Sequence, residues 1–167
     1  MPADLPGKPG TPTVSASSST EVTIQWTAGT DGGTPITDYK VYWDAGINGQ
    51  VQVAASTTGN LLTFTSTSVT VASTYKFWVV ALNFVGDGVS SDQVSVLAAS
   101  VPATPAAPSV TATYNSVALT WVAPDARGNP IDKYDIYWDP DGNANDNFSL
   151  LHTETTNLFY TVSSGIV

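Results

Sequence analysis

Few side chains in this sequence could carry acid–base or nucleophilic chemistry. The only histidine is His152, and there is no cysteine. Without cysteine, a disulfide framework, a thiolate metal site and a thiol nucleophile are all excluded. No Gly-x-Ser-x-Gly, phosphate-binding loop or His-x-x-x-His pattern occurs. We interpret His152 as an exposed strand or loop residue and predict a non-catalytic chain without a cofactor.

One acidic segment has the spacing of a cation-binding loop. Oxygen-bearing side chains stand at alternate positions from Asp139, followed by Asp141 and Asn143, as hard cations require. The loop resembles the first half of an EF-hand, but Ala144 stands where glycine is needed and Leu150 where a bidentate glutamate is needed. We therefore prefer an Asx-rich turn to a metal site. Acid–base work by the two aspartates would need a cleft, and none is evident.

A glycosylation sequon lies at the exposed end of the same turn. It is formed by Asn147, Phe148 and Ser149. Asn147 would carry a glycan only if the chain is exported by a eukaryotic cell.

The composition narrows the partners and the compartment. The formal net charge is -9, with 5 Lys+Arg against 14 Asp+Glu. Such a chain would repel a phosphate backbone or an anionic membrane, so we expect neither as a partner. No apolar stretch is long enough for a membrane helix, and the first four residues have no signal-peptide pattern. Scarce lysine with abundant serine and threonine favours an extracellular, cell-surface or virion protein.

The candidate side chains lie on segments with the period of β-strands. Val22, Ile24 and Trp26 alternate with polar residues, and so do the inward positions of 39–43. The segment 30–35 between them holds the glycines and the proline of a turn. A third alternating run covers residues 75–83, and no helical period lasts for a dozen residues.

The strand pattern occurs twice, at an offset of 95 residues between Trp26 and Trp121. Residues 22–26 correspond to 117–121, and residues 35–44 correspond without a gap to 130–139. Matched Trp, Pro, Tyr, Trp and Asp in one register indicate an internal repeat.

This order of motifs resembles the fibronectin type III module. The family has a proline-rich start, a Trp on the second strand, Pro-Ile-x-x-Tyr-x-Val-x-aromatic on the third, and a late Tyr-x-Phe-x-Val-x-Ala-x-Asn strand. The resemblance implies an all-β chain of tandem immunoglobulin-like Greek-key β-sandwiches, with strands A, B and E facing C, C′, F and G. It also places Tyr75 at the family's tyrosine corner and makes Trp26 and Trp121 core anchors.

The resemblance divides the chain into a complete domain over residues 7–99 and a truncated one over 100–167. Residues 157–159 align with 60–62, so the second copy contains strands A to E only and lacks its last two strands. A proline-stiffened linker covers residues 98–105. Either the chain is a piece of a longer tandem array or another polypeptide supplies the missing strands.

Strand parity predicts a contact patch on the first copy. If Tyr75 points into the core, then Trp78, Val80 and Leu82 point outward. Tyr42 points outward from the adjacent strand by the same parity. We expect these four residues to form one exposed apolar patch that contacts protein or glycan.

We therefore interpret the chain as a structural or adhesion module of a cell-surface, extracellular-filament or virion protein. It would act as a tandem spacer whose partners are copies of itself or neighbouring modules. Two alternatives remain. One is a carbohydrate-associated accessory module of a secreted multidomain enzyme, with Trp78 and Tyr42 stacking on sugar rings; the other is a receptor-like protein-binding module.

Overall fold

The computed structural model describes residues 2–47, 51–58, 60–139 and 148–163. The chain folds as two compact units that divide between Ser100 and Val101, and each is described by itself. All regular structure in the described residues is β-strand. Within that part of the chain, no helix of the length and apolarity needed to cross a membrane occurs.

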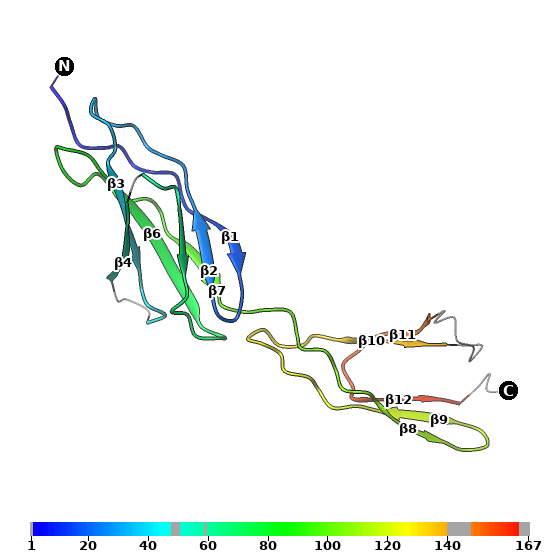
Figure 1. Cartoon of the computed structure of the whole chain (residues 1–167). Helices are drawn as coiled ribbons and strands as arrows, with labels where there is room; N and C mark the ends of the chain where they lie inside the picture. The colour runs from blue at the N-terminus through cyan, green and yellow to red at the C-terminus, as the bar shows by residue number, and fades with distance from the viewer. Residues whose placement is uncertain (1, 48–50, 59, 140–147, 164–167) are drawn as a thin grey trace. The chain divides into compact units, whose positions relative to one another are not determined.

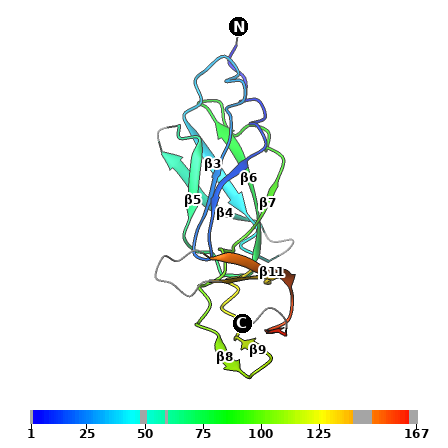
Figure 2. The same ribbon diagram turned by 90° about the vertical axis from the view of Figure 1, so that its right-hand side faces the viewer.

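Unit 1 is a sandwich of two antiparallel sheets, as expected for strands A, B and E facing C, C′, F and G (Figures 1 and 2). The three-stranded sheet has the order β1-β2-β5, with β1 (Thr13–Ser17), β2 (Val22–Gln25) and β5 (Thr63–Ser66). The four-stranded sheet has the order β4-β3-β6-β7, with β4 (Gln52–Thr58), β3 (Asp38–Trp43), β6 (Thr74–Leu82) and β7 (Val94–Leu97).

The core of unit 1 lies between the inward faces of these two sheets. Alternation places one side chain in two on this face, and the residues expected to be buried are 0–5% exposed: Trp26, Tyr39, Val41, Tyr75, Phe77 and Val79. Trp26 packs edge-on against Tyr39, with ring centroids 5.6 Å apart. The prediction of this core is confirmed.

The tyrosine corner is formed as the resemblance implied. The Tyr75 hydroxyl accepts a hydrogen bond from the backbone N–H of Thr70 at 2.6 Å, which ties the loop before β6 to the strand. The ring of Trp43 stacks on Tyr75 at 5.5 Å. Gly46 passes close by with φ 77, and a Cβ there would lie 3.1 Å from the Tyr75 ring. Both the conformation and the space at this position favour glycine.

Unit 2 repeats five of these strands. One sheet has the order β12-β9-β8, with β8 (Ser109–Ala112), β9 (Val117–Thr120) and β12 (Phe159–Val162). The other pairs β10 (Tyr134–Trp138) with β11 (Ser149–Thr155). Strands β8, β9 and β12 correspond to A, B and E, and strands β10 and β11 correspond to C and C′. In the described residues no strand takes the place that β6 and β7 have in unit 1, so the expected incomplete second sandwich is confirmed.

Candidate contact surface

Strand β6 determines which residues of unit 1 face solvent. Tyr75, Phe77, Val79 and Ala81 are 0–3% exposed, so their side chains are on the core face. Trp78 must therefore lie on the opposite face, because successive side chains alternate. Its cross-strand partner on β3 is Tyr42. Directly opposed residues share a face, so both aromatic rings stand on the outer side of the sheet, as expected. Both are half-buried, so they expose less apolar area than the sequence led us to expect.

Tyr42 and Trp78 pack against each other as a stacked pair. Their ring centroids are 5.9 Å apart and their planes differ by 11°. This separation is too short for two rings lying side by side in one plane, since their edges would come closer than the contact distance of about 3.5–4.0 Å. The rings are therefore offset-stacked, and each uses one face on the other. Such a pair contributes about 0.5–1.5 kcal/mol beyond its burial.

Val53 extends this pair onto the edge strand. It lies opposite Tyr42 in the β3–β4 register and is 57% exposed. Val53, Tyr42 and Trp78 thus form a row across β4, β3 and β6, which we call the aromatic row. We did not predict Val53 from the sequence because a bulge between Val41 and Tyr42 shifts the register. The alternation of Val51 and Val53 was the available signal.

Val80 and Leu82, the other two residues of the expected patch, do not form an open apolar surface. Val80 is only 8% exposed, so the expectation that it contributes exposed apolar area is wrong. Its cross-strand partner is Lys40, and Leu82 lies opposite Asp38. Long cationic side chains cover apolar neighbours with their methylene stems, a property the alternation pattern does not encode. Leu82 remains half-buried.

Polar groups border the aromatic row on this side. The Lys40 ammonium contacts Asp87 at 2.6 Å, and the Ser56 hydroxyl donates to the Asp38 carboxylate at 2.8 Å. The hydrogen bond to Asp87 raises the pKa of Lys40 above its ordinary value of 10.5, so the lysine is charged at neutral pH. An apolar centre with a charged border is the usual arrangement of a protein contact site.

The remaining sequence candidates lie in unit 2. Asp141, Asn143 and the sequon residue Asn147 fall outside the described residues, whereas Asp139 follows β10. The described part of the chain contains no group of three or more acidic or histidine side chains able to hold a metal. The expectation that His152 is exposed is wrong: it lies half-buried on β11, because its ring stacks on Tyr160 with centroids 4.6 Å apart.

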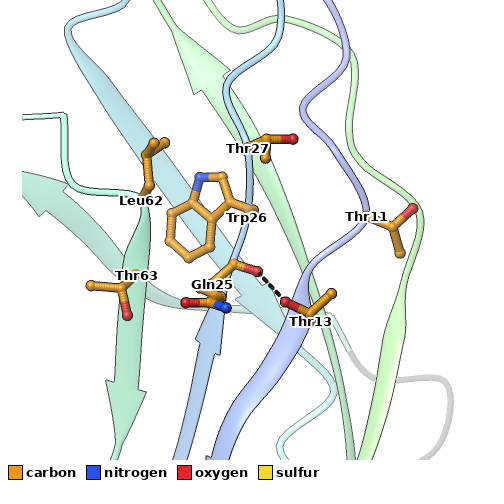
Figure 3. A pocket seen from close by; sticks show the side chains of 7 residues that line it. All are labelled: Thr11, Thr13, Gln25, Trp26, Thr27, Leu62 and Thr63. Atoms are coloured by element: carbon orange, nitrogen blue, oxygen red, sulfur yellow. Dashed lines mark hydrogen bonds between the residues drawn. The ribbon is translucent and has the colours of Figure 1, made fainter.

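A shallow groove of about 380 Å³ lies over the core tryptophan of unit 1 (Figure 3). It is lined by Thr11, Thr13, Gln25, Trp26, Thr27, Leu62 and Thr63. The Thr13 and Thr63 hydroxyls donate to backbone carbonyls of β2, those of Gln25 and Ile24. These two hydroxyls therefore reinforce strand pairing, which leaves the groove less polar than its composition suggests.

The chain is similar to a known protein family and to two known proteins. The model of the family "Fibronectin type III domain" matches residues 7–97. "Exoglucanase B" of Cellulomonas fimi is 40% identical over 77% of the chain and 12% of its own length. Human "Cell adhesion molecule-related/down-regulated by oncogenes" is 35% identical over 52% of this chain and 7% of its own length.

A solved structure shows the same fold. It is the sixth fibronectin type III domain of human fibronectin type III domain containing protein 3, with a TM-score of 0.52 and 27% identity over 62% of this chain and 97% of that one. The chain spans only about a tenth of the length of the exoglucanase and of the cell adhesion molecule-related protein. The first alignment, however, covers more residues than unit 1 contains, so the similarity reaches into the second repeat.

Proposed function

Because the chain belongs to the fibronectin type III family, we propose that it is a non-catalytic spacer of a longer extracellular or cell-surface protein, and that the aromatic row of unit 1 is its protein-contact surface. Modules of this family occur in a protein named for cell adhesion and in one named as a glucanase. Both support a module that holds or separates other domains and performs no reaction itself.

The aromatic row is the observation that carries the proposal. The inward positions of unit 1 are filled, so Tyr42 and Trp78 are not needed to close the core. Contiguous apolar groups left on a surface usually mark an interface, and Trp and Tyr are the residues enriched where binding energy concentrates. Covering apolar area stabilises a complex by about 25 cal/mol per Å². Trp78 and Tyr42 are half-buried, so only the part of each ring still in water contributes to association.

A carbohydrate-associated accessory role is the second candidate, supported by the glucanase relative. In that role the chain would lie beside a catalytic domain and hold glucan on Trp78 and Tyr42. The ring geometry argues against such a platform, because each ring already uses one face on the other, whereas a sugar-binding surface needs open, coplanar faces. We therefore favour protein contact.

The substitution Trp78→Ala tests the proposal. Phe84→Ala is the matched control, since Phe84 is 92% exposed and lies in a loop away from the row. Association of the full chain is measured by sedimentation over a concentration series, and glucan binding by electrophoresis through a gel containing soluble glucan. We expect Trp78→Ala alone to weaken self-association, with unit 1 still folded and its melting temperature lowered by no more than loss of a stack worth about 0.5–1.5 kcal/mol explains. Glucan retardation that is lost in Trp78→Ala would instead establish the accessory role.

A further inference from the structure

Strand β10 of unit 2 has one open edge. Strand β11 pairs with one side of β10 (Figure 1), and no strand in the described part of the chain pairs with the other side. In unit 1, the same side of the equivalent strand β3 is occupied by β6. An open edge presents a row of backbone N–H and C=O groups to which a further strand can add.

The side chains along β10 are of the types that meet β6 in unit 1. Tyr134, Ile136, Tyr137 and Trp138 stand at the positions of Tyr39, Val41, Tyr42 and Trp43. In unit 1 those four β3 residues lie directly opposite Ala81, Val79, Trp78 and Phe77 of β6. Strand β10 thus has the surface that a strand like β6 covers in unit 1.

This surface of β10 is apolar and partly in water. Tyr134 and Ile136 are half-buried, whereas their counterparts in unit 1 are 0% exposed. Tyr137 is 58% exposed. Hollows of about 170 and 220 Å³ lie against the strand, the first lined by Trp138 and the second by Ile136. Contiguous apolar area of this kind usually marks a contact surface.

One charged residue of β10 restricts which strand fits. Asp135 stands where β3 has Lys40, and in the register of unit 1 this position faces that of Val80. The Thr153 hydroxyl on β11 donates to the Asp135 carboxylate at 2.9 Å. Unlike charges directly opposite each other stabilise strand pairing, and like charges destabilise it. A lysine or arginine opposite Asp135 is therefore favoured, and a carboxylate is disfavoured.

We propose that unit 2 binds a β-strand of another polypeptide, which adds antiparallel to β10 in the register that β6 has on β3. The bound strand has apolar residues at alternate positions, an outward aromatic ring on Tyr137, and no carboxylate opposite Asp135. Unit 1 supports this choice of occupant, because there Trp43 stacks on Tyr75 and Phe77 of such a strand, and Tyr42 stacks on its Trp78. The site is separate from the aromatic row and does not depend on the proposed function.

A fluorescently labelled peptide with the sequence of β6, residues 74–82, is the probe. Fluorescence anisotropy during titration with the full chain should show saturable binding of one peptide per chain. The control peptide has the same composition in an order that abolishes the alternation. It should bind about tenfold or more weakly, because its apolar side chains then fall on both faces of the strand.

Opposite charges at one peptide position test the register. We expect the chain to bind the Val80→Lys peptide about threefold or more tightly than the Val80→Glu peptide, because this position faces Asp135. The difference should shrink at about 1 M salt. Asp135→Lys in the chain should reverse the order of the two peptides; Asp135 is exposed, so the change spares the core. Asp125→Lys, the same charge change in the loop before β10, is the matched control and should keep the order.

Three results would each overturn the proposal. The first is no saturable binding of the β6 peptide at millimolar chain concentration. The second is equal binding of the peptide without alternation, and the third is an order of the charged peptides that Asp135→Lys does not reverse. Trp78→Ala in the chain should leave peptide binding unchanged. Failure of this proposal and failure of the proposed function are therefore observed separately.

Discussion

The two units place the same residues in the same local geometry but bury them to different extents. Trp26 and Tyr39 meet edge-on at 5.6 Å and 66°, and Trp121 and Tyr134 meet at 5.6 Å and 67°. In unit 1 these rings are 5% and 0% exposed, whereas both of their counterparts are only half-buried. The pair contact therefore needs only strands B and C, while burial needs the strands that follow.

Strand β6 accounts for a similar difference at another pair of equivalent tryptophans. Its inward side chains cover the ring of Trp43, which stacks on Tyr75 and Phe77. The corresponding Trp138 in unit 2 is 37% exposed and lines a cavity of about 170 Å³. Hydrophobic stabilisation is proportional to the area removed from water. Equivalent residues of the two units therefore make the same pair contacts but contribute different amounts to stability.

The largest expected effect separates the two core tryptophans. Trp26→Ala should lower the free energy of unfolding of unit 1 by about 3–5 kcal/mol, because a closed core cannot fill the cavity. Trp121→Ala should cost clearly less, since part of its indole is already in water. Hydrogen exchange resolved by residue, measured on the full chain, reports the two units separately. Equal losses would contradict the inference that β6 and β7 create the difference.

The tyrosine corner gives the next effect. Tyr75→Phe removes the hydroxyl that accepts the Thr70 N–H, and leaving such a group without a partner costs about 1–3 kcal/mol. Urea denaturation should show the loss in the transition of unit 1, with that of unit 2 unchanged. Tyr42→Phe is the control, because Tyr42 contributes its ring to the stack. A similar loss in that variant would mean that the corner bond is not the cause.

A double-mutant cycle measures the energetic coupling between the stacked rings of Tyr42 and Trp78. Alanine at Tyr42 and at Trp78, singly and together, should reveal a coupling of about 0.5–1.5 kcal/mol in the stability of unit 1. Tyr137, which occupies the position of Tyr42 in unit 2, is 58% exposed; its replacement by alanine should change stability little. Coupling close to zero would show that the two rings only lie near each other.

The smallest effect is the pH dependence of the ion pairs of unit 1. The hydrogen bond from Lys8 lowers the pKa of Asp92 below its ordinary value of 3.8, so this stabilisation is present above that value and lost as pH falls through the lowered pKa. Lys40 has a raised pKa, so its contribution is complete below 10.5 and is lost as pH rises through the raised value. NMR titration of the Asp92 carboxyl checks the first. Lys8→Ala should return that pKa to its ordinary range, and an unchanged titration would exclude Lys8 as the cause.

The sequence predicted the fold more completely than the surface. Alternation and the 95-residue offset were enough for the strands, the buried Trp26 and the truncated second copy, because these depend on local pattern and on the repeat. The outward direction of Trp78 followed from Tyr75 by parity. The extent of the patch did not follow, since Val80, which lies opposite Lys40, is only 8% exposed.

Residue order alone thus determined which side chains of each strand face the core, since side chains alternate by the geometry of the backbone. Tertiary structure decided what lies beside them. The register of β3 against β4, with its bulge, brought Val53 to Tyr42, and among the described strands β4 lies at the end of its sheet with β3 as its neighbour. Pairing between strands depends on contacts between distant residues, and a periodic pattern within one strand carries no information about its neighbours.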